Sequence, residues 1–347
     1  MTYRESIKGG FEIINRNWQL VLIQIAAMFL SFVGFFILVG FPLALAFIVF
    51  GLDLTELSRV RDLLGAFHSP SEIISRYFGL AVLVLTCILL YLLVVLSMGI
   101  FIFGGAIGVI GRSIRRPFES FRMKEFLSEG RRLFLPLVGF TTAIGLVFIA
   151  LAFVLGLFGG VIAAIVSAAR EHEATLALFF GIFFSLVLFL FGAILILVTL
   201  AVTLYGAAAL TLRGFGPLAA MRESTRHLLK HGGAFALYCI VFGGYILINF
   251  VFLFLGYPLK FIPVVGPLIA VVLQFFVHVI QSYLGLVMVA TVFLYYFRTT
   301  GDEQGDRGQP DISERFSSAE SSTPETDTAG TQVQGQYDIP PRREPFE

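Results

Sequence analysis

Charged residues fall in short clusters between Arg16 and Arg298, and six long runs between these clusters contain none. The runs cover residues 17–52, 77–111, 133–169, 174–212, 231–259 and 261–297. Each run is long enough to cross a bilayer, since roughly 20 apolar residues suffice. Charged side chains are costly in hydrocarbon, and a soluble core does not exclude them over such lengths. The pattern predicts an all-α fold, a polytopic membrane bundle of six transmembrane helices.

The composition divides the chain into two parts. Hydrophobic residues make up 57% and charged residues 14% of the sequence, against ~45–50% and ~25% in soluble domains. We expect the six-helix domain to cover residues 1–298 and an acidic, disordered cytoplasmic tail to cover 299–347, because the tail has few apolar residues. Two interpretations of this tail are open: it carries a short protein-binding motif at 337–346, or it is an inert, solvating segment.

The basic residues predict the orientation of the chain. Those between residue 1 and Arg298 alternate strictly between the two sides, with 15 Lys and Arg on the side of the N-terminus and 5 on the other. Cytoplasmic loops are enriched in Lys and Arg. We therefore expect a multi-pass inner-membrane protein with both termini in the cytoplasm. The expected partners are membrane lipids, with anionic headgroups at the basic cytoplasmic loops, and no nucleic acid is expected.

A short pattern, Glu-Ser-x-Lys/Arg, occurs three times, beginning at Glu5, Glu119 and Glu223. Each copy precedes an odd-numbered span and stands in a segment with an amphipathic helical stripe. One interpretation is a threefold repeat of an interfacial helix plus a transmembrane hairpin, with the short helices over 1–16, 118–132 and 217–232. The alternative is a chance match of four letters in basic loops.

Small residues and helix breakers mark several spans. Gly104 and Gly108 form a small-xxx-small pair in the second span, which favours close helix packing, with dimerisation as the alternative. Pro42 in the first span and Gly159-Gly160 in the third are the positions where a span is most easily broken, and a re-entrant hairpin is open at either.

No motif for catalysis, for a cofactor or for a metal stands out. His172-Glu173 resembles the start of HExxH, but Leu176 stands where the second zinc ligand is required. Cys87 and Cys239 lie inside apolar runs and form no CxxC site. We therefore expect no intrinsic catalysis. An intramembrane lipid enzyme is the weakest of our hypotheses, because His278 is its one acid–base candidate.

Polar side chains gather in the last two spans. They form one helical face in each: Tyr238, Tyr245 and Asn249 in the fifth span, and Gln274, His278 and Gln281 in the sixth. Counted outward from a turn near Phe261, Asn249 lies at the depth of Gln274. Because unsatisfied polar groups are costly in hydrocarbon, we expect bonds that clamp the hairpin. A polar cavity for a ligand or a lipid headgroup is the alternative.

The end of the sixth span, Leu294-Tyr-Tyr-Phe-Arg298 followed by Glu303, resembles the helix end of a bacterial family of six-helix membrane proteins of unknown function. The segment from Phe11 to Trp18 is similar as well. A related membrane domain is fused to some glycerophosphodiester phosphodiesterases. The resemblance covers about residues 1–303 and implies the same six-helix fold. It implies no phosphodiesterase activity, since the chain has no such barrel, and it supplies no catalytic residues.

These observations favour an integral inner-membrane protein without catalysis, acting in membrane organisation, lipid handling or assistance to a partner. The alternative function is a transporter or channel for a neutral or amphipathic solute through spans five and six. Coupled transporters normally place ionisable groups at mid-membrane, and the centres of these spans hold no Asp, Glu, Lys or Arg. The first hypothesis is therefore preferred.

Overall fold

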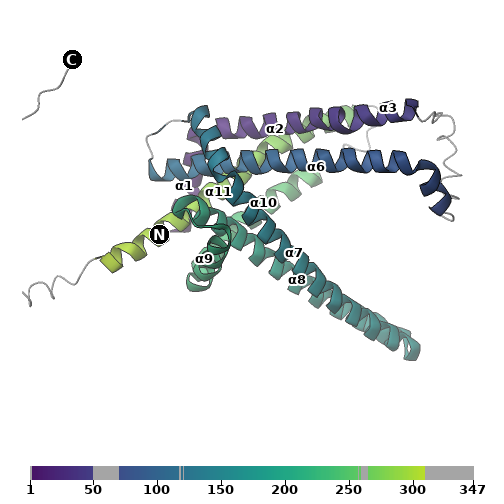
Figure 1. Cartoon of the computed structure of the whole chain (residues 1–347). Coiled ribbons are helices and arrows are strands. Elements are labelled where there is room, and N and C mark those ends of the chain that lie inside the picture. Colours follow the sequence, from purple (N-terminus) through teal and green to yellow (C-terminus); the bar gives the residue numbers. More distant parts are fainter. Residues whose placement is uncertain are drawn as a thin grey trace, which may run out of the picture. The chain divides into compact units, whose positions relative to one another are not determined.

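The computed structural model describes residues 2–49, 70–116, 119, 121–256, 258 and 265–308, and the regular elements in these ranges are all helical (Figure 1). In chain order they are α1 (Tyr3–Arg16), α2 (Gln19–Phe35), the π-helix η1 (Phe36–Gly40), α3 (Phe41–Val49), α6 (Pro70–Arg115), α7 (Met123–His172), α8 (Ala174–Arg213), α9 (Pro217–Lys230), α10 (Gly232–Gly256) and α11 (Val265–Gly308).

The predicted six spans are confirmed. Six helical stretches are long and apolar enough to cross a membrane: Gln19–Ala46, Val82–Arg115, Met123–Glu171, Ala174–Arg213, Gly232–Gly256 and Val271–Gly301. Each overlaps one charge-free run of the sequence. The chain is therefore an all-α, multi-pass membrane protein.

The two suspected helix breakers, Pro42 in the first span and Gly159-Gly160 in the third, differ in their effect on the helix. A π-helical turn over Phe36–Gly40 directly precedes Pro42 in the first span. Proline has no N–H to donate, and a wider turn is one way in which a helix accommodates the lost bond. α7 runs without interruption through Gly159 and Gly160. No re-entrant turn forms at that pair.

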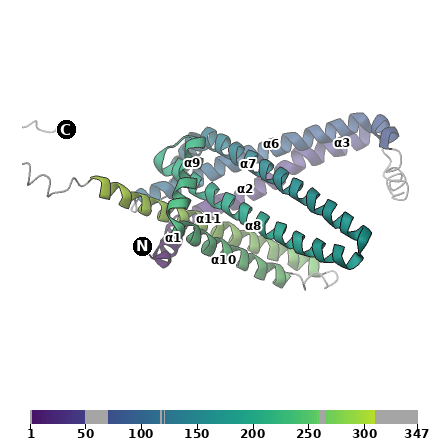
Figure 2. The same ribbon diagram turned by 90° about the horizontal axis from the view of Figure 1, so that it is seen from below.

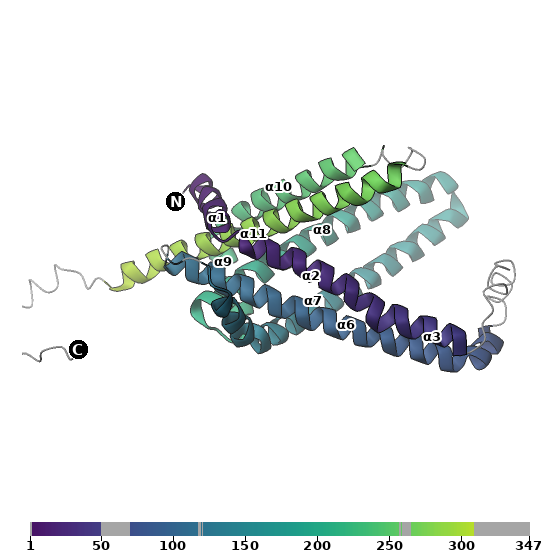
Figure 3. The ribbon, with the colours of Figure 1, turned by 90° about the horizontal axis from the view of Figure 1, so that it is seen from above.

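Neighbouring helices pack mainly as sequence-adjacent pairs. α7 and α8 form a hairpin in which Glu173, extended at φ −157° and ψ 125°, is the one residue between the helices (Figure 2). α2 lies beside α6, and α10 lies beside α11 (Figure 3). α6 also packs along α7, which links the first hairpin to the second.

Most buried residues lie in one region, where the last turns of α6 and α8 and the second half of α11 meet the first turns of α7 and α10. We call this cluster the shared core; its main segments are Ala106–Ile110, Phe126–Phe140, Ala201–Leu212, Ala234–Tyr238 and Leu286–Tyr296, with Ile13 and Ile14 from α1 and Ala220 from α9. Away from it the side chains are exposed, as for Phe153 at 67% and Phe189 at 74%. In a bilayer such surfaces contact acyl chains.

Separate short helices are present at two of the three places where interfacial helices are expected. α1 ends at Arg16, and α9 begins at Pro217 and ends at Lys230, so both are separate short helices at the predicted places. The expectation of a separate helix over 118–132 is wrong, because residues 123–132 are the first turns of the long helix α7. Arg116 precedes Pro117, which disfavours helical continuation from α6.

The motif copies also differ in their setting. Glu119 and Arg122 lie outside a helix, and Arg122 is extended at φ −131° and ψ 127°. Glu5 accepts the backbone N–H of Thr2 at 3.4 Å, whereas Glu223 pairs with Arg213. The copies in α1 and α9 share a fully buried serine, Ser6 and Ser224. The threefold repeat therefore stays a prediction, with a common setting for two copies only.

The chain divides into two compact units, residues Met1–Thr300 and Gly301–Glu347. The helical conformation of α11 continues to Gly308, ten residues beyond Arg298, so the expected tail begins as helix. The remaining tail residues, including the candidate motif at 337–346, lie outside the described residues.

Candidate functional site

The polar residues of the last hairpin meet at one pair. Nε2 of Gln281 on α11 donates a hydrogen bond to Oδ1 of Asn249 on α10. Asn249 Nδ2 in turn donates to the carbonyl oxygen of Tyr245, at 2.7 Å. Both side chains are half-buried, so the two amides satisfy each other where water is scarce.

The depth of this pair differs from the depth expected from the turn. Counting from Phe261 matched Asn249 with Gln274, whereas the bonded partner is Gln281 and Gln274 is exposed. Seven residues of α10 follow Asn249, but sixteen residues of α11 precede Gln281. The count from Phe261 failed because it assumed that α10 and α11 extend equally far from the turn.

Within the described residues no hydrogen bond joins His278 or Tyr238 to this pair. His278 is half-buried, and Tyr238 is buried in the shared core with its ring stacked on Phe242 at a centroid distance of 5.3 Å. Tyr283, which the sequence reasoning did not select, donates from its hydroxyl to Oδ1 of Asn15 at 2.7 Å. That bond joins the last span to the N-terminal helix.

Gly104 and Gly108 face α7 of the same chain. A Cβ atom on Gly104 would lie 3.0 Å from Cδ1 of Leu137, and one on Gly108 would lie 2.5 Å from Cβ of Glu129. Contacts this short leave no room for a methyl group, so the two helices touch along this glycine stripe. Glu129 is thereby held in the shared core with only 8% of its surface exposed.

A network of ion pairs surrounds Glu129 and was missed by the sequence reasoning. Arg112 lies 3.4 Å from Glu129 and 3.0 Å from Glu125, and Arg132 contacts Glu129 at 2.6 Å. A buried carboxylate is stable only when paired, which explains the two arginines. In the sequence, this network is indicated by three glutamates, Glu119, Glu125 and Glu129, that lie among the basic residues of 112–132.

The same network extends to the exposed turn after α6. Arg116 donates to Glu119 at 2.9 Å, and this hydrogen bond is the main reason why the pKa of the Glu119 carboxyl lies below its ordinary value. The same bond raises the pKa of Arg116. Both residues lie outside the membrane-spanning segments.

Aromatic and imidazole rings fill the centre of the shared core. His227 of α9 lies between Tyr205 and Tyr296, with ring centroids 5.4 and 4.9 Å away, and stacks on His231 at 4.7 Å. The Tyr205 hydroxyl donates to the carbonyl oxygen of Ala234 at 2.8 Å. The sequence analysis considered His172 and His278 but not His227 and His231, which stand one helical turn apart. These rings join α8, α9 and α11.

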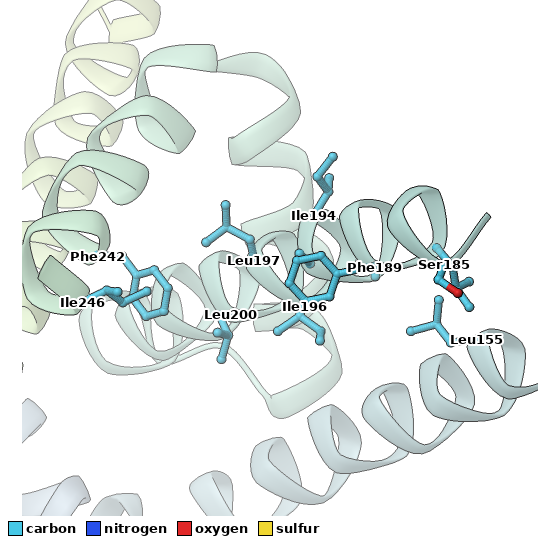
Figure 4. Close-up of a pocket in the computed structure, with 12 residues that line it drawn as sticks. Leu155, Ser185, Phe189, Ile194, Ile196, Leu197, Leu200, Phe242 and Ile246 are labelled. Atoms are coloured by element: carbon cyan, nitrogen blue, oxygen red, sulfur yellow. The ribbon is translucent and has the colours of Figure 1, made fainter. Parts of the chain in front are cut away.

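An apolar groove lies farther along α8, where that helix faces α10 (Figure 4). Its volume is about 770 Å³. The lining comes mainly from α8, with Leu155 from α7 and Phe242 and Ile246 from α10, and Ser185 is its one polar side chain. Such a surface suits a hydrocarbon chain and offers almost no hydrogen bonds to a polar solute.

A metal centre is not found in the described part of the chain: no three His, Cys, Asp or Glu side chains gather there closely enough to hold an ion. Cys87 and Cys239 are half-buried, free thiols. Comparisons with protein-family models, with curated proteins and with solved structures found no match for this chain.

Proposed function

We propose that this protein handles membrane lipid without catalysing a reaction, and that the groove between α8 and α10 holds an acyl chain. The observation that carries the proposal is the lining of this groove, which is apolar apart from Ser185 and has a volume of about 770 Å³. Pockets of about 300–1,000 Å³ are typical of sites for small ligands. A hydrocarbon chain needs no hydrogen-bonding partner there.

The orientation belongs to the same proposal. The 15-to-5 distribution of basic residues supports cytoplasmic termini in an inner membrane. The shared core and its arginines then lie at the cytoplasmic side, with the groove deeper in the bilayer. The proposal includes a relationship to the bacterial six-helix family that Leu294–Arg298 resembles.

The rival function, transport of a neutral or amphipathic solute through spans five and six, has less support. Asn249 and Gln281 bond to each other, which favours a clamp over a row of groups presented to a solute. An amide pair of this kind is worth about 0.6–2 kcal/mol in membrane helices.

Filling the groove tests the proposal. Ala193 lines it, so Ala193→Phe should reduce the phospholipid that stays bound after purification in detergent by roughly tenfold, because overpacking by a large side chain costs 1–3 kcal/mol. Native mass spectrometry counts the bound lipids. Ala150→Phe is the matched control, since Ala150 is exposed on α7 and does not line the groove.

Two results would refute the lipid-binding groove. One is that the wild-type protein retains no phospholipid under these conditions. The other is that Ala193→Phe and Ala150→Phe lose lipid to the same degree, which would indicate a general effect of a larger surface side chain.

A further inference from the structure

A second cavity, of about 400 Å³, lies at the end of the bundle that holds the shared core. Three helix ends form its walls: Arg115 closes α6, Arg132 stands in the first turns of α7, and Leu210–Phe215 lead from the end of α8 into the following turn. Gly214, at φ 69° and ψ 24°, makes that turn in the left-handed region that glycine favours.

The polar lining of this cavity is strongly basic. It contains Arg115, Arg132 and Arg213 and no acidic residue. Arg132 and Arg213 each have a carboxylate partner outside the lining, Glu129 at 2.6 Å and Glu223 at 3.5 Å. Within the described chain Arg115 pairs with no carboxylate; its guanidinium donates one bond, to the carbonyl oxygen of Leu212. A guanidinium has five N–H donors, so Arg115 keeps donors for an anion.

A buried hydroxyl adds to this set. Thr211 lines the cavity and is 6% exposed, and its Oγ1 has no hydrogen-bond partner among the residues that the structure describes. Its Cγ2 packs towards Gly111 of α6, where an added Cβ would lie 3.1 Å away. A buried hydroxyl normally finds a partner, and a bound oxyanion would supply one.

We propose that this cavity binds a phosphate group, with Arg115, Arg132 and Arg213 as its cationic contacts and Thr211 as a further donor. Arginine is suited to this chemistry because its planar fork donates two parallel bonds to phosphate oxygens. The lining arginines stand where the charge-free runs of α6, α7 and α8 end, and this is the part of a spanning helix that would meet phospholipid headgroups. A phospholipid headgroup and a soluble phosphate compound present the same chemistry. The site is separate from the groove between α8 and α10 and does not depend on acyl-chain binding there.

The test uses the full chain and two probes. In the first arm, delipidated protein in a neutral detergent is titrated with inorganic phosphate, and the thermal midpoint is followed. In the second arm, the same protein is titrated with a short-chain phosphatidylglycerol, and the diacylglycerol with the same chains, which has no phosphate, serves as the reference. Saturable stabilisation in the first arm alone indicates a soluble phosphate compound. Stabilisation in the second arm alone indicates a lipid headgroup, and both results support the site.

The variants locate the effect. Arg115→Gln should weaken binding roughly tenfold, the effect of losing a hydrogen bond to a charged group. Arg131→Gln is the matched control: it removes the same charge from an exposed neighbour of Arg132 that does not line the cavity. Thr211→Val keeps the shape of the side chain and should also weaken binding. It serves as the second variant if Arg115→Gln destabilises the end of α8.

Stabilisation in neither arm would overturn the proposal. So would equal weakening in Arg115→Gln and Arg131→Gln, since that result would mean attraction to net charge without a defined site. Ala193→Phe, which fills the apolar groove, should leave phosphate binding unchanged, so failure of the groove and failure of this site are distinguishable.

Discussion

A Cβ atom on Gly10 would overlap Oγ1 of Thr291, so the N-terminal helix and the last span pack with almost no space between their backbones. The added atom would also lie 3.1 Å from the amide nitrogen of Thr291 and from the carbonyl oxygen of Val287. Thr291 itself is fully buried. The two ends of the six-helix unit are thus joined directly.

Gly10→Ala should therefore destabilise the protein. Alanine favours a helix by about 0.5–1 kcal/mol over glycine, but the backbone atoms nearby cannot move aside easily, and overpacking costs about 1–3 kcal/mol. We expect a lower thermal midpoint in detergent. Gly99→Ala in α6 is the control, because a Cβ there meets nothing within 4 Å. It should leave the midpoint unchanged or raise it, and an equal loss in both variants would contradict close packing at Gly10.

The bond between Asn249 and Gln281 should appear as coupling in a double-mutant cycle. Asn249→Leu and Gln281→Leu each remove one partner, and the double variant should lose less stability than the sum of the two by about 0.6–2 kcal/mol. Unfolding in detergent measures this coupling. His278→Leu provides the comparison, since His278 has no hydrogen bond to the described residues. If solute uptake collapsed in His278→Leu at unchanged stability, transport would replace the clamp as the better account.

Topology reporters test the proposed orientation. Fusions after Arg16, Arg116, Arg226 and Arg307 should report the cytoplasm, and fusions near Arg61, Glu171 and Lys260 should report the opposite side, because the basic residues favour the cytoplasmic face. Alkaline phosphatase and fluorescent-protein fusions give opposite signals for the two sides. A periplasmic signal at Arg116 would reverse the orientation.

The ion pair between Arg116 and Glu119 makes one contribution to stability depend on pH. The hydrogen bond from Arg116 lowers the pKa of Glu119 in the folded protein below 4.5, its ordinary value. The stabilisation is therefore present above that value and is lost as the pH falls through the lower, folded-state pKa. We expect Glu119→Gln to have a lower thermal midpoint than the wild type at neutral pH, and the difference to vanish in acid.

The pair offers its own control. Arg116→Gln should give a smaller difference at neutral pH, because Glu119 also lies 4.0 Å from Arg112, and the double variant should lose little more than Glu119→Gln alone. Both groups are exposed, so salt should reduce the effect. A difference between wild type and Glu119→Gln that persisted in strong acid would point to a cause other than this ion pair.

Much of the fold could be predicted because hydrocarbon excludes charge. The exclusion marks each span, and the amphipathic stripes of α1 and α9 mark the two short helices. The position of the shared core could not be predicted in the same way. A span that faces lipid at Phe153 and a span that packs against protein at Ile107 are both apolar, and hydropathy does not separate the two environments.

The candidate sites were less predictable for a related reason. Asn249 and Gln281 were recognised as polar residues in apolar helices, but their pairing depends on the offset between α10 and α11, which no turn motif encodes. The arginine cavity combines Arg115, Arg132 and Thr211 from three helices. Each of them, seen alone in the sequence, is an ordinary residue near a membrane boundary.

The place of α11 in the shared core has a consequence for biogenesis. Residues Leu286–Tyr296 of α11 are among the most fully buried of the described residues. They contact α1 and the other helices of the shared core. Hairpins can enter a membrane one after another as they are synthesised, since each satisfies its backbone internally, and helix association follows insertion. The ribosome delivers α11 last. The earlier spans can therefore pair as they are inserted, as α6 does with α7 and α7 with α8, but the shared core is completed only when the final span arrives.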